Sequence, residues 1–132
     1  MLKIPRSIQE ALFAQALQED PLECCGLLAG KDDQATHLYQ VKNADKSSTT
    51  YLMEPREQLL AFTNMRHNHL ELLAIYHSHT HTPAYPSATD ARLAYYPDSY
   101  YLIISLLKKD APDMRIFRII NGEVKEENFE II

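Results

Sequence analysis

The chain has 132 residues, a length that fits one domain, residues 1–132, and leaves no room for two. Its hydrophobic fraction of 45% and charged fraction of 23% are those of a folded globular protein rather than a disordered one. Asp and Glu outnumber Lys and Arg by 18 to 13, and the basic residues are scattered, so we expect no binding to nucleic acid.

The two cysteines, Cys24 and Cys25, are adjacent. Neighbouring cysteines rarely reach disulfide geometry, so we expect free thiols, which suit a reducing cytosol. The first ten residues, MLKIPRSIQE, lack the apolar core of a signal peptide. The longest apolar stretch, residues 100–107, is too short to cross a bilayer. These features predict a cytoplasmic protein that does not enter a membrane.

The first predicted elements are a helix and a hairpin. Ser7 and Glu10 have the spacing of a capping box, which predicts a helix that starts at Ser7 and is closed by Pro21. The apolar run at 24–29 predicts a buried strand. After a polar turn, residues 37–41 predict a second strand that pairs with it.

The rest of the chain alternates helices with buried strands. Pro55 suits the first turn of a helix that runs to about Asn68. The remaining predicted elements are a central strand at 72–76, a helix at 87–95, a second central strand at 100–107, and a hairpin of 114–120 and 124–131 around Asn121-Gly122. Three helices interleaved with about six strands indicate a single α/β (α+β) domain with a mixed sheet.

Two histidines directly follow the strand predicted at 72–76. His77 and His79 are two positions apart, so on an extended backbone both imidazoles point to one face. Asp90 lies eleven residues after His79, in the first turn of the next predicted helix, and the loop can return its carboxylate to the strand end. Two nitrogens, one oxygen and a position left for water are typical of a catalytic rather than a structural zinc site.

Each part of this pattern also has a simpler interpretation. A His-x-His pair at a strand end is more often structural or incidental than a metal site, and Ser87 with Asp90 has the spacing of a helix capping box. A second pair, His67 and His69, falls on a predicted helix, where positions i and i+2 do not face one another. We therefore reject that second pair as a site.

Glu23 favours a catalytic metal site over these simpler interpretations. It begins an otherwise apolar strand, where burying a carboxylate is unfavourable unless the group has a partner. A catalytic zinc needs a nearby carboxylate that takes a proton from the attacking water and passes it to the leaving amine. If Glu23 stood alone, a surface residue at a strand end would be the better interpretation.

Together these residues resemble the signature of the JAMM (MPN-plus) metallopeptidases. That signature is a glutamate far upstream, then His-Ser/Thr-His, seven residues, Ser, two residues and Asp. The matching positions are Glu23, His77-Ser78-His79, Ser87 and Asp90. The segment PLECCGLL at 21–28 also resembles the family's Pro-x-Glu-x-Cys-Gly-Leu-Leu strand. The resemblance extends from the first helix through at least Leu107.

The resemblance implies a fold and a role for each residue. The implied fold is a single MPN-type domain, a mixed curved β-sheet with three helices, cytidine-deaminase-like. His77, His79 and Asp90 would bind one zinc ion per chain, Glu23 would act as general acid and base, and Ser87 would donate a hydrogen bond to the oxyanion. The implied reaction is hydrolysis of a peptide or isopeptide bond, commonly after the diglycine tail of a ubiquitin-like protein.

Two features narrow the expected substrate. Thr80 stands where many members have proline, and the pattern HSHT…AYPS…D is similar to bacterial members that remove cysteine or a tail from ubiquitin-like sulfur-carrier proteins. The chain is also too short for the insertions that eukaryotic deubiquitinases use to recognise polyubiquitin. The expected partner is therefore a sulfur-carrier protein with a diglycine tail. Tyr51 and Met53 lie where a groove for that tail could form.

Two other functions deserve weight. The first is a non-catalytic scaffold, because many proteins of this fold lack the metal, but here every ligand is retained. The second is a nucleobase deaminase, which needs His-x-Glu followed by Pro-Cys-x-x-Cys, and the chain has neither. The ligand types also accept iron or cobalt. The oligomeric state is left open, although an exposed sheet edge could pair in a homodimer.

Overall fold

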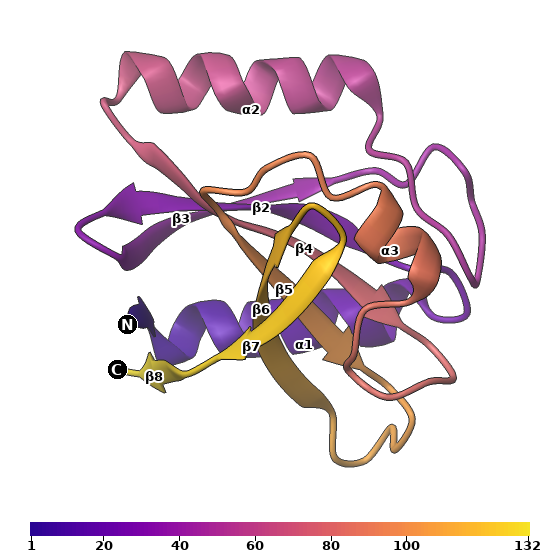
Figure 1. The fold of residues 1–132 in the computed structure, drawn as a ribbon. Coiled ribbons are helices and arrows are strands. Elements are labelled where there is room, and N and C mark those ends of the chain that lie inside the picture. The colour runs from indigo at the N-terminus through magenta and orange to yellow at the C-terminus, as the bar shows by residue number, and fades with distance from the viewer.

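The computed structural model describes all of residues 1–132 and contains one eight-stranded sheet with three helices (Figure 1). The helices are α1 (Arg6–Glu19), α2 (Pro55–His67) and α3 (Ala88–Arg92). The strands are β1 (Leu2–Ile4), β2 (Cys25–Lys31), β3 (Gln34–Val41), β4 (Glu71–His79), β5 (Tyr100–Ser105), β6 (Asp113–Ile120), β7 (Glu123–Glu127) and β8 (Phe129–Ile131). No helix combines the length and the apolar character that a membrane span needs.

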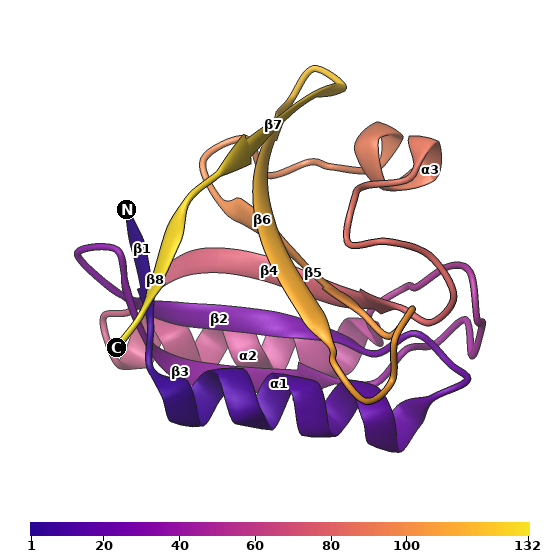
Figure 2. The same cartoon turned by 90° about the horizontal axis from the view of Figure 1, so that it is seen from below.

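The strands follow the order β7-β6-β5-β4-β2-β3-β1-β8. The pairs β4–β5, β1–β3 and β1–β8 are parallel, and the other pairs are antiparallel. Although β7 and β8 are consecutive in the chain, they lie at opposite ends of this order. Figure 2 shows that the sheet curls strongly. β8, which follows β7 in the chain, can therefore pair with β1 at the other end of the strand order. The predicted mixed, curved sheet is confirmed.

Two helices cover opposite faces of the central strands (Figure 1). One apolar core lies under α1 and the other lies under α2. The side chains of β4 alternate between them, since Tyr76 belongs to the α1 core and Ile75 to the α2 core. Because the central strands are covered on both faces, they read as continuous apolar runs in the sequence.

The structure corrects three of the predicted elements. The capping box at Ser7 and Glu10 is wrong, because α1 begins one residue earlier, at Arg6, and no side chain caps it. Pro5 precedes the helix, and its carbonyl accepts the N–H groups of Ile8 and Gln9. The helix predicted at 87–95 ends at Arg92. There are eight strands rather than six, because residues 124–131 divide between β7 and β8 and because the three-residue β1 is too short to give a periodic signal.

Candidate active site

The sheet brings two histidines to one face at the end of its central strand. β4 runs through His79, so the His-x-His pair belongs to the strand itself rather than to the loop after it. β4 lies between β2 and β5, where His77 pairs in register with Cys25 and Ile103. Both imidazoles are buried, with exposed fractions of 2% for His77 and 5% for His79. Burial between two strands fixes the two rings in space.

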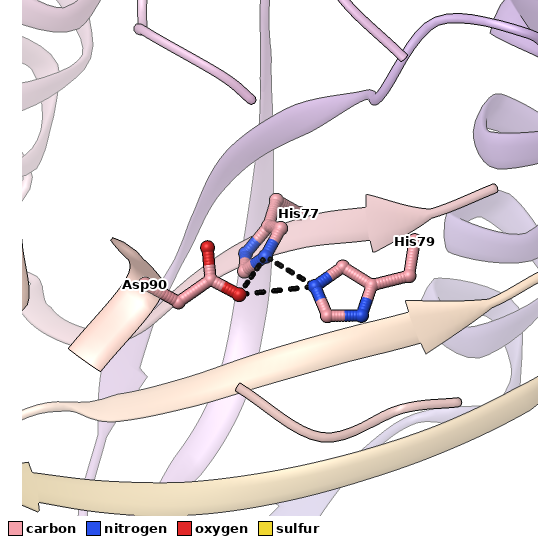
Figure 3. Close-up of side chains that lie close together, drawn as sticks. All are labelled: His77, His79 and Asp90. Carbon is pink, nitrogen blue, oxygen red and sulfur yellow. Dashed lines mark hydrogen bonds and ion pairs between the residues drawn. The ribbon is translucent and has the colours of Figure 1, made fainter. Parts of the chain in front are cut away.

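Asp90 completes a cluster with these two rings (Figure 3). Its Oδ2 lies 3.1 Å from Nε2 of His77 and 3.0 Å from Nε2 of His79, and the two Nε2 atoms are 3.1 Å apart. One donor atom from each residue therefore converges on a common point, as a metal site requires. The structure brings together the three residues that the sequence selected as ligands.

The chemistry of this cluster fits a cation. Nδ1 of His79 lies 2.9 Å from the carbonyl oxygen of Pro83, which can only accept, so Nδ1 carries the proton. In neutral His79 the Nε2 lone pair then faces the Asp90 carboxylate and the Nε2 atom of His77. A cation at the point that these three atoms share would accept a lone pair from each of them. Two imidazoles and one carboxylate are ligands that zinc prefers.

Ser87 and Asp90 form a capping box at the start of α3, beside the two histidines. The Ser87 hydroxyl accepts the N–H of Asp90 at 3.0 Å, and Oδ2 of Asp90 accepts the N–H of Ser87 at 2.9 Å. The two interpretations of the Ser-x-x-Asp spacing are thus compatible, because the cap holds the carboxylate in the position where it meets the histidines. The hydroxyl proton of Ser87 is not used by the cap.

The charges of the cluster follow from its hydrogen bonds. Burial opposes ionisation of Asp90, but hydrogen bonds from His77 and His79 outweigh it and hold the Asp90 pKa well below its usual range. Burial lowers the pKa of His77. Burial also disfavours the charged form of His79, yet the hydrogen bonds to Asp90 and Pro83 raise its pKa above the ordinary value. Because a metal ion binds the neutral imidazole, the raised pKa of His79 makes metal binding more sensitive to pH.

Glu23 lies in the segment before β2 and is buried, with an exposed fraction of 4%. Its Oε1 atom has no hydrogen-bond partner. Burial raises the pKa of Glu23 to about 8, an effect that the positive charge of His79 reduces and the negative charge of Asp90 increases. The carboxyl group is therefore close enough to the cluster to sense both charges, and it titrates near neutral pH.

Tyr51 packs against one of the clustered histidines. Its ring stacks on His77 with the centroids 4.4 Å apart and the planes 22° from parallel. Sequence patterns placed Tyr51 only in a possible groove and gave no sign of this contact. They also missed Pro83, because any residue supplies a backbone carbonyl and its identity carries no signal. Nδ1 of His77 is buried without a partner.

The adjacent cysteines take no part in the site. Cys24 packs in the α1 core and Cys25 in the α2 core, and both are free and fully buried. Burial raises the pKa of Cys24 to about 12 and raises that of Cys25 as well. Neither thiol forms the thiolate that nucleophilic catalysis needs at neutral pH.

Most of this chain matches a known protein family. A family model described as prokaryotic homologs of the JAB domain matches residues 5–120. The chain belongs to this family, as the JAMM signature in its sequence predicted.

Two curated relatives narrow the comparison. A CysO-cysteine peptidase from Mycobacterium tuberculosis is 36% identical over 134 residues, which cover 100% of this chain and 92% of the relative. A probable TtuB-protein conjugate cleaving protease from Thermus thermophilus is 38% identical over 95 residues, which cover 71% of this chain and 64% of that protein.

Solved structures share the fold. A solution structure of a protein from Desulfitobacterium hafniense has a TM-score of 0.90 and 40% identity, covering 100% of this chain and 93% of that one. A JAB1/MPN domain protein from Archaeoglobus fulgidus has a TM-score of 0.64 and 18% identity, covering 99% of each chain. The second likeness confirms the predicted MPN-type fold.

Proposed function

We propose that this protein is a zinc-dependent peptidase or isopeptidase that hydrolyses the amide bond after the C-terminal diglycine of a ubiquitin-like or sulfur-carrier protein. The observation that carries the proposal is the convergence of His77, His79 and Asp90 beside a buried, unpaired Glu23. The relatives named for cleaving CysO-cysteine and TtuB conjugates support the substrate class.

Three residues would hold one zinc ion per chain. His77 and His79 would bind through Nε2 and Asp90 through Oδ2, the atoms that already face one another. Zinc, when bound, supplies Lewis acidity that polarises the scissile carbonyl and makes a water molecule acidic. The hydrogen bond from His79 to Pro83 keeps its ring in the tautomer that binds metal.

Glu23 would move the proton during the reaction. A carboxyl group with a pKa near 8 is close to the operating pH, where a single group both accepts and returns a proton most effectively. Glu23 takes a proton from the attacking water and then delivers it to the nitrogen of the leaving amine. Its burial keeps the carboxylate free of competing hydrogen bonds to solvent.

Ser87 would stabilise the oxyanion. Its oxygen is occupied as the acceptor in the α3 cap, which leaves the hydroxyl proton free to be donated to the substrate carbonyl oxygen. Such a donor lowers the barrier by about 3 to 4 kcal/mol. Residues 1–132 would carry all of these groups within one domain, and the free, buried cysteines suit a reducing compartment such as the cytoplasm.

The proposal is tested by cleavage of defined fusions. Sulfur-carrier proteins ending in diglycine are joined to a C-terminal cysteine, a short peptide or a lysine side chain, and the products are identified by intact-mass spectrometry. We expect the zinc-loaded protein to release the diglycine-ended carrier, and the metal-stripped protein and Glu23→Gln to be inactive. Cleavage that survives both metal removal and Glu23→Gln contradicts the mechanism. A protein that binds no zinc and cleaves no fusion fits a scaffold instead.

A further inference from the structure

The loop that joins β3 to α2, residues 42–54, lies at the same side of the molecule as α3 (Figure 1). Backbone hydrogen bonds close it: the N–H of Glu54 donates to the Lys42 carbonyl at 2.9 Å, and that of Ala44 donates to the Leu52 carbonyl at 2.7 Å. Tyr51, which stacks on His77, belongs to this loop. The loop therefore reaches the candidate metal site.

The side chain of Asn43 fills the loop and is buried, with 4% exposed. Its Oδ1 accepts the N–H groups of Asp45 and Leu52, both at 3.0 Å. Its Nδ2 donates to the carbonyls of Thr50 at 3.0 Å and Glu23 at 3.1 Å. Both amide protons and both lone pairs of the oxygen are used, so this buried amide is fully satisfied. Glu23 is its one partner outside the loop.

The backbone around Glu23 is held from two directions. The loop holds Glu23 itself, because its N–H donates to the Ser47 carbonyl at 2.8 Å and its own carbonyl accepts from Asn43. Strand β4 holds the next residue, because the N–H of Cys24 donates to the Ser78 hydroxyl at 2.8 Å. No hydrogen bond restrains the buried Oε1 atom of Glu23. The hydrogen bonds that hold Glu23 are therefore made by its backbone.

We propose that Asn43 is a positioning residue of the active site. It joins the backbone of Glu23 to the loop that places Tyr51 on His77, and so sets the proton-transferring carboxyl group relative to the metal ligands. The inference rests on the proposed function, because it gives Asn43 its effect through Glu23. Asn43 does not contact the cluster of His77, His79 and Asp90 itself.

Two substitutions separate the parts of this role. Asn43→Asp keeps an acceptor for the N–H groups of Asp45 and Leu52 but removes the donors to the carbonyls of Glu23 and Thr50. Asn43→Ala removes the acceptor and the donors. Asn64→Asp is the matched control, because Asn64 is exposed on α2 and an aspartate there still accepts the hydrogen bond from Tyr39. The three variants are compared with the wild type by kcat and KM on a diglycine-tail fusion, by zinc content and by amide hydrogen exchange.

We expect kcat to fall by about tenfold to a hundredfold in both Asn43 variants, as a displaced catalytic group predicts, while KM changes little. Zinc content stays at the wild-type level, because the ligands lie on β4 and α3. Amide exchange becomes faster at Glu23 in both variants and at Leu52 in Asn43→Ala, and it stays unchanged in β4 and β5. Asn64→Asp behaves as the wild type.

Other results overturn the proposal. If kcat in both variants equals that of Asn64→Asp, Asn43 does not position Glu23. If zinc is lost together with activity, the role of Asn43 is general to the fold. If the wild type cleaves no fusion, the proposed function fails. Amide exchange then tests separately whether Asn43 holds the backbone of Glu23. Unchanged exchange at Glu23 in Asn43→Ala refutes that role of Asn43, and faster exchange confined to Glu23 and the loop supports it.

Discussion

Tyr76 and His77 are consecutive residues of β4, both buried, and they face opposite sides of the sheet. On the α1 side, the Tyr76 hydroxyl donates to Oε1 of Gln15 at 2.6 Å. Nε2 of Gln15 donates in turn to Glu19 at 3.0 Å and to the Cys25 carbonyl at 3.3 Å. Each side-chain donor and acceptor of this network has a partner, which is what holds a helix to a sheet.

On the opposite side of β4, which we call the incomplete side, buried polar atoms lack hydrogen-bond partners. Nδ1 of His77 and Oε1 of Glu23 are buried without hydrogen-bond partners. Nε2 of His77 lies 3.1 Å from both Oδ2 of Asp90 and Nε2 of His79, which are the candidate metal ligands. Buried polar atoms without partners are rare in folded proteins, because each one lowers stability. On these two sides of β4, the satisfied polar groups join a helix to the sheet, and the unsatisfied ones lie at the candidate metal site. The following substitutions test that division.

His77→Ala removes a ligand from the incomplete side and should have the largest effect. We expect zinc to be lost and cleavage to fall at least about a thousandfold, since a catalytic metal supplies several kcal/mol of transition-state stabilisation. Metal analysis and fusion cleavage measure both. His67→Ala, at the exposed end of α2, is the control and should match the wild type. Equal losses of zinc and of cleavage in His77→Ala and His67→Ala would contradict the assignment of the metal site to the incomplete side of β4.

Glu23→Gln keeps the shape of the side chain and removes its ability to accept a proton. We expect kcat to fall by about 10² to 10⁴, the range for general acid–base catalysis, with zinc still bound. Single-turnover cleavage of the fusion checks this result. Wild-type turnover with full zinc occupancy would remove Glu23 from the mechanism.

The same substitution should stabilise the metal-free protein at high pH. Folding raises the pKa of Glu23 from 4.5 to about 8. The folded state thus retains a proton that the unfolded state has released, and wild-type stability falls as pH rises from about 4.5 through 8. Glu23→Gln avoids this loss and should gain relative stability up to at most roughly 5 kcal/mol above pH 8. Urea unfolding between pH 4 and 9 measures the difference, with exposed Glu10→Gln as control. A difference that does not change with pH contradicts the burial of an ionisable group.

Ser87→Ala removes both the cap of α3 and the proposed oxyanion donor. We expect kcat to fall by about 10² to 10³ and stability to fall by about 1 kcal/mol. Ser87→Thr keeps a hydroxyl group and should therefore retain most of the wild-type kcat and most of the wild-type stability. The two readouts separate the roles: if Ser87→Ala lowers the melting temperature but leaves kcat unchanged, the residue is only a cap.

Tyr76→Phe should have the smallest effect on catalysis, because it acts on the satisfied side. It leaves Oε1 of Gln15 buried without its donor, so we expect a loss of about 1 to 3 kcal/mol in the free energy of unfolding. Chemical denaturation measures the loss, and kcat of the zinc-loaded protein should equal that of the wild type. A large fall in kcat without loss of zinc would show that the two sides are coupled.

The metal cluster was predictable because its geometry is local. The alternation of a strand places His77 and His79 on one face, and the spacing of Asp90 matches a capped helix that follows a short loop. Glu23 is different, because its link to the cluster crosses more than fifty residues. An acidic residue at the start of an apolar strand first pointed to it, and the family signature then connected it to the histidines.

Long-range contacts were the features that the sequence did not predict. Asn43 sits in the polar stretch NADKSSTT, which has the composition of an exposed loop, yet it is buried against the backbone of Glu23. Strand β1 pairs with β3 and β8. Its three residues are too few to show the alternating pattern from which a strand is predicted. Both features depend on tertiary contacts that local propensity does not encode.

Calorimetric titration of the metal-free protein with zinc shows whether the incomplete side of β4 binds the ion. We expect one ion per chain, and we expect metal affinity to fall as the pH falls, because a protonated His79 cannot bind the ion. Binding should be lost in His77→Ala and retained in His67→Ala. A wild-type protein that takes up no zinc, or a His77→Ala variant that binds it equally well, contradicts the account.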